Sequence, residues 1–315
     1  MVLDNFYKDK RILVTGGSGL LGTHLVRVLS ESGAIVRSVF HERDPQERLD
    51  SVEYVQYDLR NYDDCRKATN GMDYVFHCAA KSLGAKVIKE DPKSLVTHNI
   101  LINSNLLDAS VDSGVKRFLF VSSNVVYPVL DHSVKEEDAT GEFFEFYKGP
   151  AIMKYFTEKL CDFYSSRYLM KCIVVRPANY FGPYDKIGEG SHVIPALIER
   201  ALSKEDPFVV WGTGENVKDL IYVEDVALGI KEAMKRDTTP VNIGSGKGYK
   251  VKEIVKIILE LTSNQDRKIY FDSSKPDAIM YRVLDTRKSG FIPQTDLREA
   301  IKKTIEWHKS RKIHV

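Results

Sequence analysis

The segment Thr15-Gly16-Gly17-Ser18-Gly19-Leu20-Leu21-Gly22 separates an apolar, β-rich run from a stretch with helical spacing of apolar residues. Its G-x-x-G-x-x-G spacing allows a tight turn, close approach of the backbone to a pyrophosphate, and close packing of helix on strand. The free N–H groups and the positive dipole end of the following helix then face the phosphates. A glycine-rich turn without a ligand is the alternative. The strand–loop–helix context favours a dinucleotide, bound at Gly16, Gly19, Leu20, Leu21 and Gly22.

Outward from this loop, β-rich runs alternate with amphipathic helical stretches. Strands are expected at Arg11–Thr15, Ala34–Val39, Val52–Tyr57, Asp73–Cys78, Arg117–Ser122 and Lys171–Arg176, and helices at Leu20–Ser30, Asp63–Thr69, Ser94–Ser113 and Ala151–Tyr168. This alternation predicts right-handed βαβ units and a Rossmann-type, doubly wound parallel sheet. The strands are apolar on both faces, as expected when helices cover both sides of the sheet.

After Arg176 the sequence becomes rich in proline and glycine, and further helices and strands follow. We therefore expect an α/β fold in two parts. A dinucleotide-binding Rossmann domain spans residues 1–176 and is rejoined by about residues 217–243. A smaller C-terminal α/β region, residues 177–315, binds the substrate. No polar linker separates the parts, so the second is expected to pack against the first, with the ligand site between them.

The 315 residues include 46 Lys and Arg against 44 Asp and Glu, which is typical of an ordinary globular protein. This composition argues against disordered, collagen-like and strongly basic nucleic-acid-binding proteins. The N-terminus lacks a signal-peptide pattern, and no apolar run approaches the roughly 20 residues of a membrane span. Four cysteines without paired spacing indicate a reducing compartment. We expect a cytoplasmic protein without nucleic-acid or membrane partners and, from the histidine spacing, without a metal site.

The end of the second strand indicates the cofactor type. An NAD-binding chain commonly places an acid there for the ribose 2′-hydroxyl, whereas this strand ends at Phe40 and a cation, Arg43, follows closely. We favour NADP(H), with Arg43 on the 2′-phosphate and Arg37 as a second cation. NAD(H) is the alternative, with Arg43 as a solvated loop residue. Asp58, followed by Leu59, is placed for the adenine amine, or else it caps the next helix.

Several motifs resemble those of the extended short-chain dehydrogenase/reductase family over nearly the whole chain. They are TGGSGLLG, YDLR at 57–60, HCAA at 77–80, Asn99, SSNVVY at 122–127 and RPANYFGP at 176–183. Other segments are similar to the GDP-fucose synthase subfamily: AAK at 79–81, SHVIPAL at 191–197, VVWGTG at 209–214 and KPD at 275–277. The resemblance implies a nicotinamide cofactor in a Rossmann domain, a nucleotide-sugar substrate and a homodimer formed through two long helices. It also implies cofactor contacts from Ala79, Ala80, Lys81 and Asn99.

In this family a serine, a tyrosine and a lysine act on the sugar 4-oxygen while hydride moves to or from the nicotinamide. Ser123 matches the serine, and Lys154 matches the lysine, which also holds the nicotinamide ribose. The tyrosine position is Pro150, which has no titratable group but suits the first turn of a helix. Three interpretations stay open. Tyr147 or Glu145 supplies the proton from the preceding loop, an acid/base elsewhere does so, or the site binds ligand without hydride chemistry.

Two further positions bear on the reaction. Related dehydratases carry an Asp-Glu pair where this chain has Asn124 and Val125, which cannot perform acid/base elimination. The subfamily's epimerase histidine is retained as His192, but Val125 occupies the position of its cysteine. His192 is therefore a candidate for a single proton transfer beside a ketone, or else it caps the helix that follows.

On the substrate side, the resemblance places Asn179 near the sugar and diphosphate and Lys218 against the diphosphate. It places Lys275 and Asp277 in a loop over the nucleotide. Trp211 either packs on the base or sugar or belongs to the core. The expected function is an NAD(P)-dependent oxidoreductase or epimerase acting at C4, or at C3 or C5, of a GDP-linked sugar. The alternatives are a catalytically silent cofactor-binding sensor or partner subunit, and an atypical dehydratase or oxidase with tightly bound cofactor.

Overall fold

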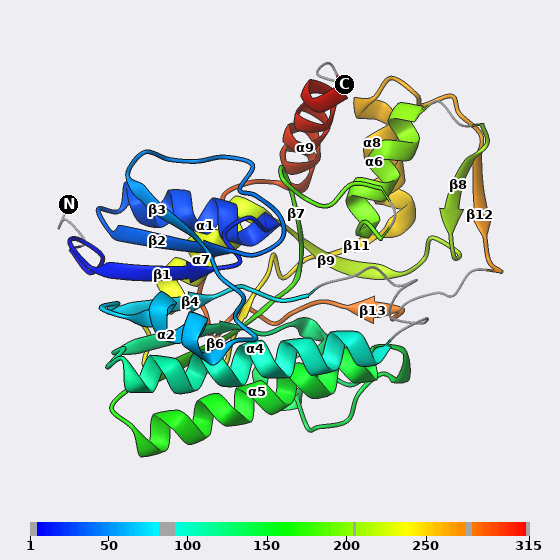
Figure 1. The fold of residues 1–315 in the computed structure, drawn as a ribbon. Coiled ribbons are helices and arrows are strands. Elements are labelled where there is room, and N and C mark those ends of the chain that lie inside the picture. The colour runs from blue at the N-terminus through cyan, green and yellow to red at the C-terminus, as the bar shows by residue number, and fades with distance from the viewer. Residues whose placement is uncertain (1–4, 82–91, 189, 204–205, 275–278, 313–315) are drawn as a thin grey trace.

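The computed structural model describes residues 5–81, 92–188, 190–203, 206–274 and 279–312. Parallel strands form a seven-stranded main sheet in the order β10-β6-β5-β4-β1-β2-β3 (Figure 1). Their bounds are β1 Arg11–Thr15, β2 Ile35–Phe40, β3 Val52–Gln56, β4 Tyr74–His77, β5 Arg117–Val121, β6 Lys171–Pro177 and β10 Val241–Ile243. The strand order reverses beside β1, where the glycine loop lies. This is the predicted Rossmann-type doubly wound α/β fold.

Helices cover both faces of the main sheet. On one face α1 (Leu20–Glu31) packs against α7 (Val223–Ala233). The other face carries α2 (Tyr62–Thr69), α4 (Pro92–Asp112) and α5 (Lys148–Arg167). Side-chain alternation along β1 separates two cores, since Ile12 and Val14 pack with α1, whereas Leu13 packs with α2 and α4. Burial on both faces explains the nearly continuous apolar sequence of these strands.

The C-terminal part carries two smaller sheets. In one, β9 (Val217–Tyr222) pairs with β7 (Asn179–Phe181), β11 (Gly248–Lys250) and β13 (Tyr281–Arg282); in the other, β8 (Phe208–Trp211) pairs with β12 (Ile269–Asp272). Helices α6 (Val193–Ser203), α8 (Val251–Leu261) and α9 (Leu297–Lys312) pack with them. The sequence patterns do not predict β7, β9, β11 or β13. Of these, β7, β11 and β13 have only two or three residues, which is too short to show alternation.

The chain returns to the main sheet after β9. Helix α7 packs on α1, and β10 pairs with β6 at the edge of the sheet. The hydroxyl of Tyr7, near the N-terminus, donates to the carbonyl of Lys231 in α7 at 2.5 Å. By contrast, β9 belongs to the smaller sheet. Among the helices that the structure describes, none is long and apolar enough to cross a membrane.

Candidate active site

Close backbone contacts shape the glycine loop after β1. Gly16 adopts φ +71°, and a Cβ there would lie 2.8 Å from the backbone nitrogen of Ala79, just after β4. A Cβ on Gly22 would lie 2.0 Å from the carbonyl oxygen of Gly16, so any side chain would push the loop away from α1. The other predicted contacts of this loop form the cap and first turn of α1: Gly19, Leu20 and Leu21. No side chain caps α1, which leaves its first N–H groups for a phosphate.

The segment after β4 is held by buried polar side chains. The N–H of Ala79 donates to the hydroxyl of Thr15 at 3.1 Å, and this hydroxyl lies 2.8 Å from Nδ1 of His77. Burial lowers the pKa of His77 to about 3, so the ring stays neutral. The amide of Asn99 binds both the N–H and the carbonyl of Lys81, at 2.8 and 3.1 Å. Asn99 is buried, and its two bonds fix the backbone of Lys81. The side chains of Ala80 and Lys81 are exposed.

Two arginines on and after β2 differ in their surroundings. Arg43 is exposed, and none of the described residues forms a hydrogen bond or ion pair with it. Arg37 instead donates to Glu53 at 2.8 Å and to the carbonyls of Lys67 and Ala68 at the end of α2. The guanidinium of Arg37 is therefore already bonded to Glu53 of β3 and to the end of α2, which speaks against the expected role of Arg37 as a second cation for the cofactor.

The residues after β3 are also engaged. The carboxylate of Asp58 binds the guanidinium of Arg60, which lowers the pKa of Asp58 to about 2. Nε2 of His41 lies 3.9 Å from the same carboxylate. The side chain of Leu59 is buried in the core with α2 and α4, so only its backbone can face a cofactor.

The structure brings Ser123 and Lys154 to the carboxyl end of β5. Lys154 of α5 donates from Nζ to the carbonyl of Val121, the last residue of β5, at 2.7 Å. Its Nζ also lies 4.7 Å from the centroid of the Phe120 ring. Burial lowers the pKa of Lys154 to about 8. Ser123, two residues after Val121, caps a short 3-10 turn by accepting the N–H of Val125 at 3.3 Å.

Pro150 lies in the first turn of α5, which begins at Lys148 and continues without a break through Lys154. The prediction that the helix tolerates proline at this position is confirmed, because first-turn N–H groups have no intrahelical acceptor. Tyr147 precedes the helix, and its half-buried ring contacts Phe146 edge-on. It stands seven residues before Lys154 but outside α5, at the end of the short 3-10 turn Glu145–Tyr147. Burial raises the pKa of Tyr147.

His192 directly precedes α6 and contacts Asp185. Its Nδ1 lies 3.2 Å from Oδ1 of Asp185, which is buried, while the imidazole is 52% exposed. The alternative prediction, that His192 caps the helix, holds for its backbone and not for its side chain. Its carbonyl accepts the N–H of Ala196 at 3.1 Å, whereas its ring contacts Asp185. The hydrogen bond to Asp185 raises the pKa of His192, against the effect of burial.

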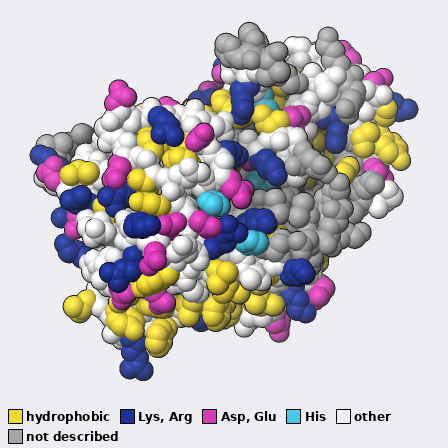
Figure 2. Space-filling view, in the orientation of Figure 1, with side chains coloured by type: hydrophobic (Ala, Val, Ile, Leu, Met, Phe, Trp, Pro, Cys, Tyr) yellow, Lys and Arg dark blue, Asp and Glu magenta, His cyan; other side chains and the backbone are white. Residues whose placement is uncertain are grey.

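The remaining predicted contacts lie in the C-terminal part. Asn179 is exposed on β7 and pairs in register with Leu220 of β9, so Asn179 and Lys218 share one face of the small sheet. Trp211 is 54% exposed at the end of β8, which makes the core interpretation wrong. Lys275 and Asp277 fall outside the described residues. Figure 2 shows basic, acidic and histidine side chains interspersed near the centre of the displayed face.

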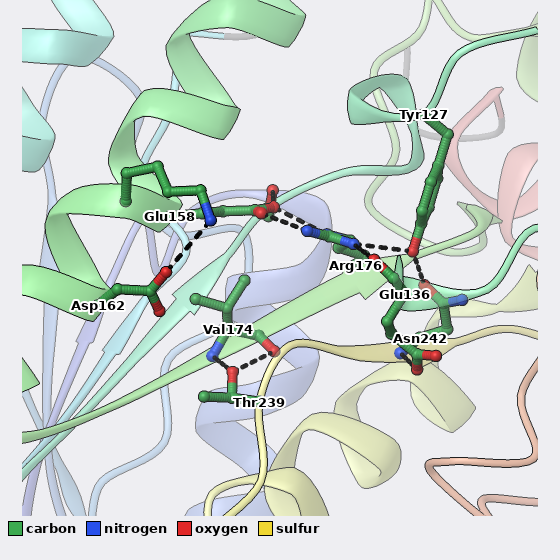
Figure 3. A network of polar contacts seen from close by, with 10 residues as sticks. Tyr127, Glu136, Glu158, Asp162, Val174, Arg176, Thr239 and Asn242 are labelled. Carbon is green, nitrogen blue, oxygen red and sulfur yellow. Dashed lines mark hydrogen bonds and ion pairs between the residues drawn. The ribbon is translucent and has the colours of Figure 1, made fainter. Parts of the chain in front are cut away.

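A buried ion pair beneath Ser123 and Lys154 was not among the predicted residues. Arg176 of β6 and Glu158 of α5, each with a 4% exposed side chain, approach to 2.5 Å (Figure 3). The same guanidinium donates to the hydroxyl of Tyr127 at 3.2 Å, and Ser122 donates to Glu158 at 2.5 Å. The i, i+4 spacing of Lys154 and Glu158 places both on one face of α5, but it does not indicate Arg176 as the partner of Glu158. Within the described ranges, no three His, Cys, Asp or Glu side chains are arranged to hold a metal ion.

Comparison with known proteins shows which family and which fold this chain shares. The model of the NAD dependent epimerase/dehydratase family matches residues 12–244. GDP-mannose 3,5-epimerase 1 of Oryza sativa subsp. japonica is 31% identical over 96% of this chain and 82% of its own length. GDP-L-fucose synthase of Escherichia coli K12 is 28% identical over 95% of this chain and 96% of its own. A solved UDP-glucose 4-epimerase of Thermotoga maritima with UDP-glucose has a TM-score of 0.87 and 28% identity, covering 96% of this chain and 99% of that one.

Proposed function

The chain belongs to the NAD dependent epimerase/dehydratase family, and on that premise we propose that it oxidises, reduces or epimerises a GDP-linked sugar at C4, or at C3 or C5. The observation that carries this proposal is the Ser123–Lys154 pair at the end of β5, since Lys154 binds the carbonyl of Val121 at 2.7 Å. The names of the rice and E. coli relatives support a GDP-sugar. Three of the substrate candidates, Asn179, Lys218 and Trp211, would then face the nucleotide sugar.

The residues present fit a dinucleotide. Because Gly22 has no Cβ, the glycine loop packs closely against α1, which brings the loop backbone and the first N–H groups of α1 together for a pyrophosphate. The nicotinamide, when bound, supplies hydride transfer. Ser123 would bind the 4-oxygen of the sugar, and Lys154 would hold the nicotinamide ribose through its partly buried ammonium. The backbones at 16–22 and 79–81, together with Asp58, would hold the rest of the cofactor.

The proton donor is the open part of this mechanism, because Pro150 cannot transfer a proton. We favour Tyr147, which directly precedes α5. Glu145 is a weaker candidate, since its exposed carboxylate pairs with Lys148 at 2.9 Å. His192 would act on a carbon beside the ketone rather than on the 4-oxygen.

An NMR time course in D₂O tests the function. The first substrate is GDP-4-keto-6-deoxymannose with NADPH, and the panel is GDP-mannose and UDP-glucose, each with NADP⁺ or NAD⁺ as the hydride acceptor. Loss of the ketone indicates reduction. Deuterium beside the ketone indicates proton removal from that carbon, and inverted configuration there indicates epimerisation. The variant Tyr147→Phe is expected to slow ketone reduction by about 100-fold or more if Tyr147 is the acid. NADPH binding without any change in the panel would support a silent cofactor-binding protein instead.

Cofactor preference is expected to depend on Arg43. We favour NADP(H), because Arg43 is exposed where the second strand ends and a 2′-phosphate would give it an anionic partner. Arg43→Ala should weaken NADPH binding about tenfold and leave NADH binding nearly unchanged. Fluorescence titration of both cofactors measures this. Equal weakening of both would assign Arg43 to the pyrophosphate or to the fold, and no change would favour NAD(H).

We also propose a homodimer through α4 and α5. Ile152, Phe156 and Phe163 follow helical spacing along one face of α5, and each is more than two-fifths exposed. Leu101 of α4 is similarly exposed. A second copy would cover this apolar face, and the mass from sedimentation equilibrium distinguishes a dimer from a monomer.

A further inference from the structure

The loop between β7 and α6 contains an aspartate–histidine pair with unequal burial. Nδ1 of His192 lies 3.2 Å from Oδ1 of Asp185, and the two side chains are 52% and 2% exposed. The ring is therefore anchored at one nitrogen by a buried carboxylate. The described residues provide no hydrogen-bond partner for Nε2, so this nitrogen is available to a ligand.

The hydrogen bonds within the loop do not explain why the carboxylate of Asp185 is buried. Its Oδ1 also accepts the N–H of Lys186 at 2.7 Å, but its Oδ2 is buried and meets no donor within the described residues. Among the described residues, His192 is also the only basic side chain within ion-pair distance of Asp185. A buried carboxylate with an unpaired oxygen destabilises the folded state, and such groups concentrate at functional sites.

We propose that Asp185 is a positioning residue that holds the Nδ1–H tautomer of His192 and presents Nε2 to the carbon next to the ketone of a keto-sugar. The inference rests on the proposed function. Nε2 takes the proton of the C–H bond, and the C–H electron pair forms the double bond of an enolate whose charge lies on the former ketone oxygen. The imidazolium then returns a proton to that carbon, so no oxidant or further reactant is needed.

The groups around the pair set the sign of the pH dependence. Asp185 and Lys186 come from the loop itself, Tyr180 of β7 lies close enough to interact electrostatically with Asp185, and Glu199 of α6 accepts the N–H of Gly188. Since the bond to Asp185 raises the pKa of His192, Asp185→Asn should lower it. The acid limb of a base-catalysed rate should then move to lower pH. The rate above that limb should fall, because the amide no longer selects the Nδ1–H tautomer.

The experiment uses the full-length protein with NADP⁺, so that reduction does not compete, and follows deuterium entry into GDP-4-keto-6-deoxymannose in D₂O. In parallel, ¹⁵N-histidine NMR records the tautomer and titration of His192, whose signal is identified by its loss in His192→Gln. We expect Asp185→Asn to lower the exchange rate about 10- to 1,000-fold with little change in KM, and to move the His192 titration to lower pH.

The matched control is Asp131→Asn. Asp131 and His132 have the same kind of contact, Nδ1 to Oδ1 at 3.1 Å, but both side chains are exposed. This control should leave exchange and the His192 signal unchanged. If Asp185→Asn does not fold, the wild-type tautomer decides, and an Nε2–H form of neutral His192 would overturn the assignment. An unchanged His192 titration in Asp185→Asn overturns it too. A shifted titration without exchange in the wild type supports the positioning by Asp185 and counts against the proposed function.

Discussion

The variant Lys154→Met is expected to lower kcat/KM by about 10²- to 10⁴-fold. Methionine keeps the apolar volume of the stem but removes the ammonium that binds the carbonyl of Val121 at the end of β5. Steady-state kinetics with NADPH and the substrate found in the panel measure the loss. The control is Lys159→Met on the same helix, because Lys159 is exposed, lies 3.4 Å from Asp162 and otherwise contacts the ring of Tyr155. Near-native turnover in Lys154→Met would remove the reaction from this position.

Lys154 also predicts a pH effect of known sign. Burial lowers its pKa from 10.5 to about 8, so between these values the unfolded chain holds a proton that the folded protein has released. The free energy of unfolding contributed by this group therefore rises with pH through that window. Denaturant titrations from pH 8 to 10.5 should show this rise in the wild type, and it should be reduced in Lys154→Met. Activity should fall on the alkaline side as the ammonium is lost.

The second large effect is expected on stability, in the variant Glu158→Leu. It leaves the guanidinium of Arg176 buried without an anion and the hydroxyl of Ser122 without its acceptor. Breaking a buried ion pair in this way costs about 3–5 kcal/mol of unfolding free energy. Chemical denaturation gives the value.

Two further variants test whether the unpaired buried charge of Arg176 causes the loss of stability in Glu158→Leu. Glu158→Leu combined with Arg176→Met removes both charges, so we expect it to regain part of the lost stability. Glu145→Gln removes an exposed carboxylate beside Lys148 and should cost less than about 1 kcal/mol. A double variant as unstable as Glu158→Leu would mean that the bonds from Arg176 to Tyr127 and Glu136, and not the ion pair, dominate.

The sequence predicts those elements whose apolar periodicity or glycine spacing is complete within a short stretch of the chain. The glycine loop, the strands of the main sheet and the helix around Pro150 all belong to this class, with ends that differ by at most three residues from those expected. Strand β5, for example, ends at Val121 and not at Ser122, because Ser123 already caps the next turn.

The features that the sequence did not indicate depend on contacts between distant elements. Glu158 and Arg176 meet across α5 and β6, and Asp185 reaches His192 across a loop without any periodicity. Arg37 illustrates the reverse case. Its position on β2 allowed a cofactor contact, but the carbonyls at the end of α2 and the carboxylate of Glu53 offer it acceptors in the folded chain. Side-chain partners of this kind follow from the tertiary fold and not from spacing.

The return of α7 and β10 to the main sheet limits how the two halves of this chain can be exchanged or shortened. A fragment ending at Arg176 would stop within β6, leave the edge of that strand without β10, and uncover the side of α1 that faces α7. Such a fragment would present an open strand edge and an apolar helix face, two features that promote aggregation. Chimeras with relatives should therefore transplant residues 223–243 together with the N-terminal half, so that substrate specificity is exchanged without dividing the sheet.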